Sequence, residues 1–100
     1  MTGTQIIKQG RGILEAGGWV VRSMNYHKAT PRGMHGFPDM IAFKGGVTLL
    51  LEIKGDGDRI RPDQEQFFNE VKLHTGMCLR YFLVHDIEQI VDIAEMRMIA

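Results

Sequence analysis

The stretch from Val47 to Lys54 constrains the fold of this chain more than any other segment. Its run Val-Thr-Leu-Leu-Leu is apolar at consecutive positions, so a strand here would be apolar on both faces. That pattern is typical of a strand in the middle of a sheet covered on both sides. Glu52 and Lys54 end the strand. Because side chains alternate along a strand, these two share a face, about 7 Å apart.

Hydrophobic periodicity and turn residues predict the other elements of the fold. We expect helices over residues 4–16, 62–75 and 87–94, further strands over 19–24, 39–43 and 77–84, and loops over 25–38 and 55–61. Gly10 and Gly12 should weaken the first helix, at about 1 kcal/mol each relative to Ala. We expect Phe67, Phe68 and Val71 to point inward, and Trp19 and Cys78 to lie in the core. The order αβββαβα predicts an α/β fold, a small mixed sheet flanked by helices, in a single domain over residues 1–100.

Composition excludes several classes of protein. The 100 residues carry no net charge, which argues against a general nucleic-acid binder. The charges are divided, however: nine Lys/Arg and five Asp/Glu fall in residues 1–61, against three and seven in 62–100. No signal peptide or membrane-spanning run is visible. The one cysteine excludes an intrachain disulfide and fits a reducing cytoplasm, and the histidines show no zinc-ligand spacing.

Three polar residues interrupt the apolar pattern of the predicted sheet. Asp39 begins one strand, and Glu52 and Lys54 end the next. Adjacent strands would bring Asp39 and Glu52 together, and converging carboxylates suit a hard cation such as Mg²⁺ (or Mn²⁺). The main-chain carbonyl of Ile53 would add an oxygen, and Lys54 would hold or polarise the attacking water. The alternative is a Glu–Lys ion pair at a strand end, with Asp39 in a turn.

Four sequence segments together resemble the virus-type replication-repair nuclease (VRR-NUC) family of the PD-(D/E)xK superfamily, over nearly the whole chain. They are Gly17-Gly-Trp-Val-Val-Arg22, Gly36-Phe-Pro-Asp39, Leu51-Glu-Ile-Lys-Gly55 and Arg59-Ile-Arg-Pro-Asp-Gln64. The resemblance implies a restriction-endonuclease-like core with Asp39, Glu52, Lys54 and Gln64 as catalytic residues. It also implies a metal-dependent DNA endonuclease, a homodimer that cuts branched DNA such as Holliday junctions, in phage or bacterial recombination or repair. The expected location is the cytoplasm of a bacterial or phage-infected cell.

The chain departs from the family's pattern in the first helix. Members usually carry a Glu there that helps to build the metal site, whereas this chain offers Gln5. Loop residues are candidates for phosphate contacts: Lys28, Arg32, His35, Arg59 and Arg61. The function expected is a Mg²⁺- or Mn²⁺-dependent endodeoxyribonuclease without a small-molecule cofactor. A weakened DNA-binding subunit of the same fold and a structural domain with an accidental motif remain the alternatives.

Overall fold

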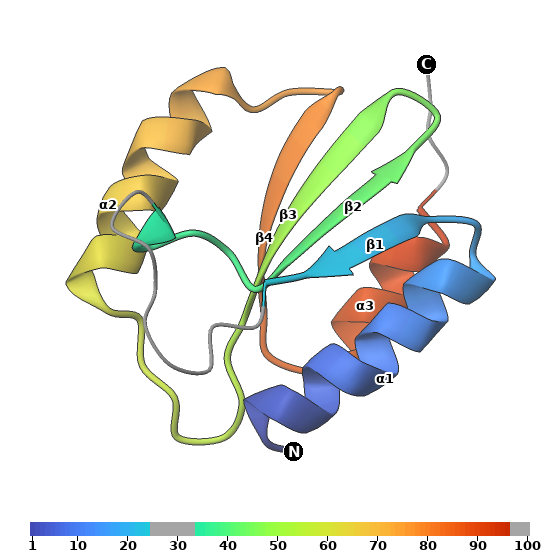
Figure 1. Cartoon of the computed structure of the whole chain (residues 1–100), viewed down its shortest axis with the longest axis horizontal. Helices are drawn as coiled ribbons and strands as arrows, with labels where there is room; N and C mark the ends of the chain where they lie inside the picture. Colours follow the sequence, from blue (N-terminus) through green and yellow to red (C-terminus); the bar gives the residue numbers. More distant parts are fainter. Residues whose placement is uncertain (25–33, 97–100) are drawn as a thin grey trace.

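The computed structural model describes residues 1–24 and 34–96 as three α-helices and a four-stranded sheet (Figure 1). In chain order the elements are α1 (Gly3–Ala16), β1 (Val20–Ser23), β2 (Met40–Lys44), β3 (Val47–Ile53), α2 (Pro62–Val71), the 3-10 turn η2 (Lys72–His74), β4 (Leu79–Val84) and α3 (Ile87–Ala94). The predicted order αβββαβα is therefore confirmed. Among the described residues, no helix has the length and apolar character that crossing a membrane requires.

The strands lie in the order in which the chain makes them, β1-β2-β3-β4. The first two pairings are antiparallel and the third, between β3 and β4, is parallel. Helices α1 and α3 cover one face of this mixed sheet, and α2 lies on the other side (Figure 1). The sheet is thus flanked by helices on both faces, as predicted.

Strand β3 is buried almost throughout, as its composition predicts. Leu49, Leu51 and Ile53 join the main core with residues of α1 and α3, such as Ile6 and Ile90. The alternate positions of the strand therefore face α2. Glu52 therefore lies on the face of β3 turned toward α2, next to the buried Leu50.

Helix α1 begins with a capping box, in which Thr2 Oγ1 accepts from the N–H of Gln5 and Gln5 Oε1 accepts from the N–H of Thr2. Gly10 is buried against α3, where an added Cβ would lie 2.3 Å from Cδ1 of Ile90. Gly10 weakens the helix, but because it has no side chain it lets α1 and α3 pack closely at this position.

Three predictions for the second half of the chain are wrong in detail. Helix α2 ends at Val71 rather than near residue 75, because the chain tightens into η2. Phe68 was predicted to be buried but is 39% exposed. Its ring still contacts that of Tyr81 edge-on, with the two ring centroids 5.0 Å apart. Cys78 is exposed and precedes β4; only its main-chain carbonyl joins the sheet, accepting from the N–H of Thr48. Trp19, in contrast, lies in the core as predicted.

Candidate active site

The pairing of β2 with β3 brings Asp39 and Glu52 together. Met40 lies opposite Leu51, so in antiparallel register the preceding residue, Asp39, falls opposite Glu52. Asp39 stands one position before β2, and its Oδ2 accepts a hydrogen bond of 2.8 Å from the main-chain N–H of Ile53. This bond fixes one carboxylate oxygen at the end of β3.

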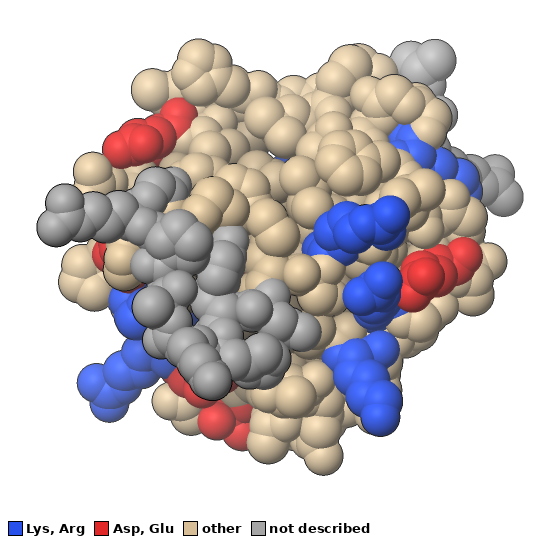
Figure 2. Space-filling view, in the orientation of Figure 1, with Lys and Arg blue, Asp and Glu red and all other residues tan. Residues whose placement is uncertain are grey.

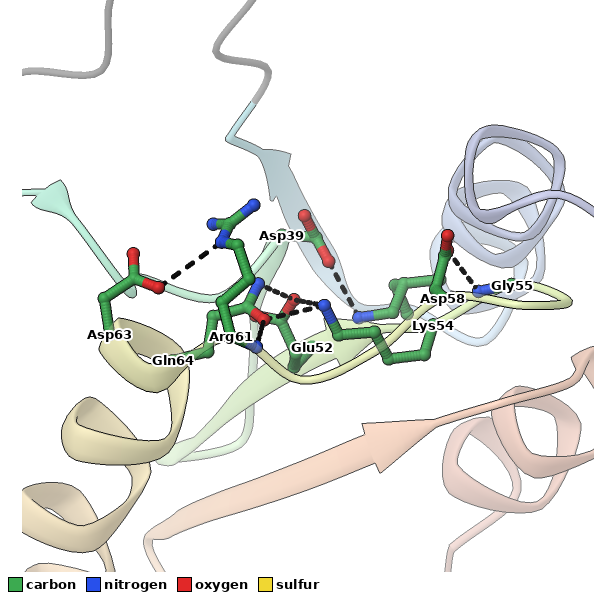
Figure 3. A network of polar contacts seen from close by, with 9 residues as sticks. Asp39, Glu52, Lys54, Gly55, Asp58, Arg61, Asp63 and Gln64 are labelled. Carbon is green, nitrogen blue, oxygen red and sulfur yellow. Dashed lines mark hydrogen bonds and ion pairs between the residues drawn. The ribbon is translucent and has the colours of Figure 1, made fainter.

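Glu52, Lys54 and Gln64 form a buried polar network (Figure 3). Gln64 Nε2 donates to Glu52 Oε1 at 2.8 Å, and Lys54 Nζ donates to Gln64 Oε1 at 2.7 Å. Lys54 Nζ also lies 3.6 Å from Glu52 Oε1. The three residues are only 2%, 7% and 5% exposed. The Glu–Lys ion pair of the alternative interpretation is therefore present, but it is buried and joined to Gln64 by two hydrogen bonds.

Helix α2 supplies Gln64 through its first turn. Pro62 opens the helix, and Gln64 Oε1 accepts the main-chain N–H of Arg61 at 2.9 Å while it also binds Lys54. One amide side chain therefore caps the helix and joins it to β3. Gln64 is the buried residue of α2, which explains a polar side chain on an otherwise apolar stripe.

The electrostatics of the site disfavour the ionised form of Glu52. Burial first, and then the charge of Asp39, raise the pKa of Glu52 from its ordinary 4.5 to about 8, against the opposing charges of Lys54 and Arg61. Tyr81 responds to the same field: burial and the charges of Glu52 and Asp39 raise the pKa of its hydroxyl. These effects favour the protonated form of Glu52 as long as no cation is bound beside it.

The donor set fits a hard divalent cation. Among the buried side-chain polar atoms of the described residues, only Glu52 Oε2 and Trp19 Nε1 lack a hydrogen-bond partner. An unpartnered carboxylate oxygen beside Asp39 is what a cation would satisfy. No group of three or more His, Cys, Asp or Glu side chains gathers as a metal site in the parts of the chain described. A cation here would thus rely on two carboxylates, those of Asp39 and Glu52, and Mg²⁺, which retains waters, needs few protein ligands.

These residues line a pocket of about 430 Å³. Of the other candidates from the sequence, Ile53, His35, Arg59 and Arg61 line it too, whereas Lys28 and Arg32 lie outside the described residues. Gln5 does not line it, because its side chain is engaged in the capping box of α1.

The pocket is also lined by residues that the sequence did not single out. Helix α1 lines it through Gly3, Thr4 and Ile7, so this helix offers no carboxylate there. Asp58 does line it, and its Oδ2 accepts the N–H of Gly55 at 2.8 Å (Figure 3). Its position only four residues after Lys54, in a short charged loop, is the signal that would have singled it out.

The mixed sheet therefore carries the partly buried Asp39, the buried Glu52 and the buried Lys54 at one end of its two central strands. Comparison with solved structures identifies the fold. The chain superimposes on a structure described as a VRR_NUC domain with a TM-score of 0.71 and 21% sequence identity, over 95% of this chain and 97% of the other. The chain therefore has the fold of a VRR_NUC domain. Neither a protein-family model nor a curated protein matches the sequence.

Proposed function

We propose that this protein is a Mg²⁺- or Mn²⁺-dependent endodeoxyribonuclease that hydrolyses phosphodiester bonds. The observation that carries the proposal is the buried Glu52–Gln64–Lys54 network beside Asp39, with the unpartnered Glu52 Oε2 at a polar pocket. Burying a carboxylate oxygen without a partner is costly, and an ion pair with a purely structural role would not explain why Glu52 Oε2 is left without one. The nuclease-type fold supports the same function.

In this proposal each residue has a separate task. Asp39, Glu52 and the main-chain carbonyl of Ile53 hold the cation, which when bound supplies Lewis acidity and positive charge at the scissile phosphate. Gln64 holds the ammonium of Lys54 beside Glu52, 2.7 Å from its own Oε1. Lys54 then offsets negative charge that develops on the phosphate during attack by water.

Side chains around the pocket are candidates for binding the DNA backbone. Arg59 and Arg61 are exposed and line the same pocket, as does His35. In this role they bind neighbouring phosphates and position the DNA without reading its sequence. Lys28 and Arg32 are proposed for the same role from the sequence alone.

Cleavage by a Lys54 variant tests the proposal. Lys54→Ala, and the more conservative Lys54→Met, should lower the cleavage rate at least about hundredfold, the loss typical when one charge-stabilising group is removed. Lys44→Ala is the matched control, because Lys44 is exposed and lies at the opposite end of β2. The substrates are duplex, flap, single-stranded and four-way-junction DNA with Mg²⁺ or Mn²⁺. Wild-type turnover by both Lys54 variants would remove this residue from the mechanism.

We propose branched DNA as the substrate and a homodimer as the active assembly. The process would be phage or bacterial recombination or repair within the cell. Exposed apolar side chains support an assembly: Val20 and Phe43, opposite each other in the sheet, are 54% and 42% exposed. The DNA panel tests the substrate, because a dimer that resolves junctions cuts them in paired positions.

A second candidate is a DNA-binding subunit with weakened catalysis. The specific observation in its favour is that Gly3, Thr4 and Ile7, the residues of α1 at the pocket, provide no carboxylate ligand. Such a protein would bind the same DNA panel without cutting it, even in saturating Mn²⁺. Metal-dependent cleavage excludes this candidate.

A further inference from the structure

Basic side chains outside the pocket gather over α1 and β1, with an acidic group beside them (Figure 2). The contributors are Lys8 and Arg11 of α1 and Arg22 of β1, which we call the α1–β1 patch. Lys8 and Arg22 are exposed, and the side chain of Arg11 is 42% exposed. None of the three is among the residues that line the pocket, so the proposed chemistry leaves them unused.

The patch begins at the mouth of the pocket. Thr4 lines the pocket, and Lys8 and Arg11 follow it at spacings of four and three, which places all three on one stripe of α1. At 1.5 Å per residue, Lys8 and Arg11 lie about 6 Å and about 10 Å along the helix from Thr4. On β1, Arg22 stands two residues before Met24, which also lines the pocket. Both elements therefore lead basic groups outward from the same site.

The neighbouring helix carries the opposite charge. On α3, which packs beside α1, Glu88 and Asp92 are exposed, and the exposed Glu95 follows directly after the helix. Their spacings of four and three give an acidic stripe. On α1 the acidic residue is Glu15, paired with Arg11 at 3.1 Å. This exposed pair is weak and exchangeable. The helical layer is thus divided into a basic side on α1 and an acidic side on α3, which favours a polyanion along α1 rather than along α3.

We propose that the α1–β1 patch binds the DNA backbone on one side of the scissile phosphate, an inference that rests on the proposed nuclease function. The stripe from Thr4 to Arg11, about 10 Å, corresponds to about three nucleotides at 3.4 Å each along one strand. Productive binding therefore needs a flank of about three nucleotides on that side of the cut. The contacts are to phosphates, so this requirement is independent of sequence.

The test measures DNA binding without cleavage, in Ca²⁺ or EDTA, by fluorescence anisotropy. The variant is Lys8→Gln/Arg11→Gln/Arg22→Gln, and Lys72→Gln, an exposed lysine after α2, is the control. Each phosphate contact contributes about 0.9 to the slope of log Kd against log salt. The triple variant should bind at least about hundredfold more weakly near 100 mM salt, with a slope shallower by about two to three. Lys72→Gln should match the wild type.

Substrate length provides the second arm of the test. Shortening one flank below about three nucleotides should weaken binding by the wild type and leave the triple variant unchanged, because both changes remove the same contacts. Glu15→Gln releases Arg11 from its ion pair and should tighten binding. Circular dichroism verifies that each variant is folded.

Two results would overturn the inference, and only the second would also overturn the proposed nuclease function. If the wild type binds DNA and the triple variant keeps its affinity and salt slope, the patch is not a DNA contact, while the proposed nuclease function stands. If the wild type binds none of the DNAs, the patch and the nuclease function fail together.

Discussion

Replacing Glu52 by Gln removes the charge that the folded protein least tolerates. Glu52 is 2% exposed, and burial together with Asp39 raises its pKa from 4.5 to about 8. Between these two values the folded protein keeps a proton that the unfolded chain has lost. Folding stability therefore falls as pH rises through this interval. Glutamine keeps the shape of the side chain and can still accept the bond from Gln64 Nε2.

The magnitude follows from the interval between the two pKa values. At about 1.4 kcal/mol per pH unit, the interval from 4.5 to about 8 gives an upper bound of roughly 5 kcal/mol at pH above 8. Without metal, the Glu52→Gln protein should lack this fall in the free energy of unfolding. In Mn²⁺ the wild type should instead be the more stable of the two proteins, because only the wild type gains stability by binding the cation.

Urea unfolding in EDTA at several values between pH 5.5 and 8.5 measures the effect. The quantity compared is the slope of unfolding free energy against pH for the wild type, Glu52→Gln and Glu88→Gln, whose side chain is exposed on α3. We expect the wild type and Glu88→Gln to share the steeper fall. Equal slopes in all three proteins would refute the assignment of the raised pKa to Glu52.

Three further predictions concern metal, backbone and assembly. Asp39→Asn should weaken Mn²⁺ binding at least tenfold by calorimetry, and unchanged affinity would remove Asp39 from the cation site. Gly36→Ala should cost more than about 2 kcal/mol in urea unfolding, because φ is +81° and the new Cβ would lie 2.2 Å from the carbonyl oxygen of Asp63. Gly46→Ala, at φ +80° in open space, should lose only about 1–2 kcal/mol, and equal losses would contradict the clash. Light scattering should give twice the 11.3 kDa of the chain, with acidic α3 or the exposed apolar face as the interface, and a mass of one chain that persists with DNA would exclude the dimer.

Much of the fold could be predicted because its signals are local. The apolar run of β3, the glycines after α1 and before β3, and Pro62 at the start of α2 each act within a few residues. Asp39, Glu52 and Lys54 stood out for the same reason, as polar groups beside or within apolar strands. Helix α2 was predicted less well. Its aromatic residues suggest a buried stripe, but Gln64 is the buried residue of this helix, and Phe68 stays 39% exposed although it contacts Tyr81 of β4.

What the sequence determined by itself is the list of strands and the chemical types at their ends, since alternation and strand propensity are properties of neighbouring residues. Only the tertiary structure decided which of those residues meet. It placed Gln64 between Glu52 and Lys54, gave Asp58 a place at the pocket, and kept Gln5 in a helix cap. The physical reason is that burial, which raises the pKa of Glu52 and leaves its Oε2 without a partner, depends on β3 and α2 being packed together, and no local pattern specifies that packing.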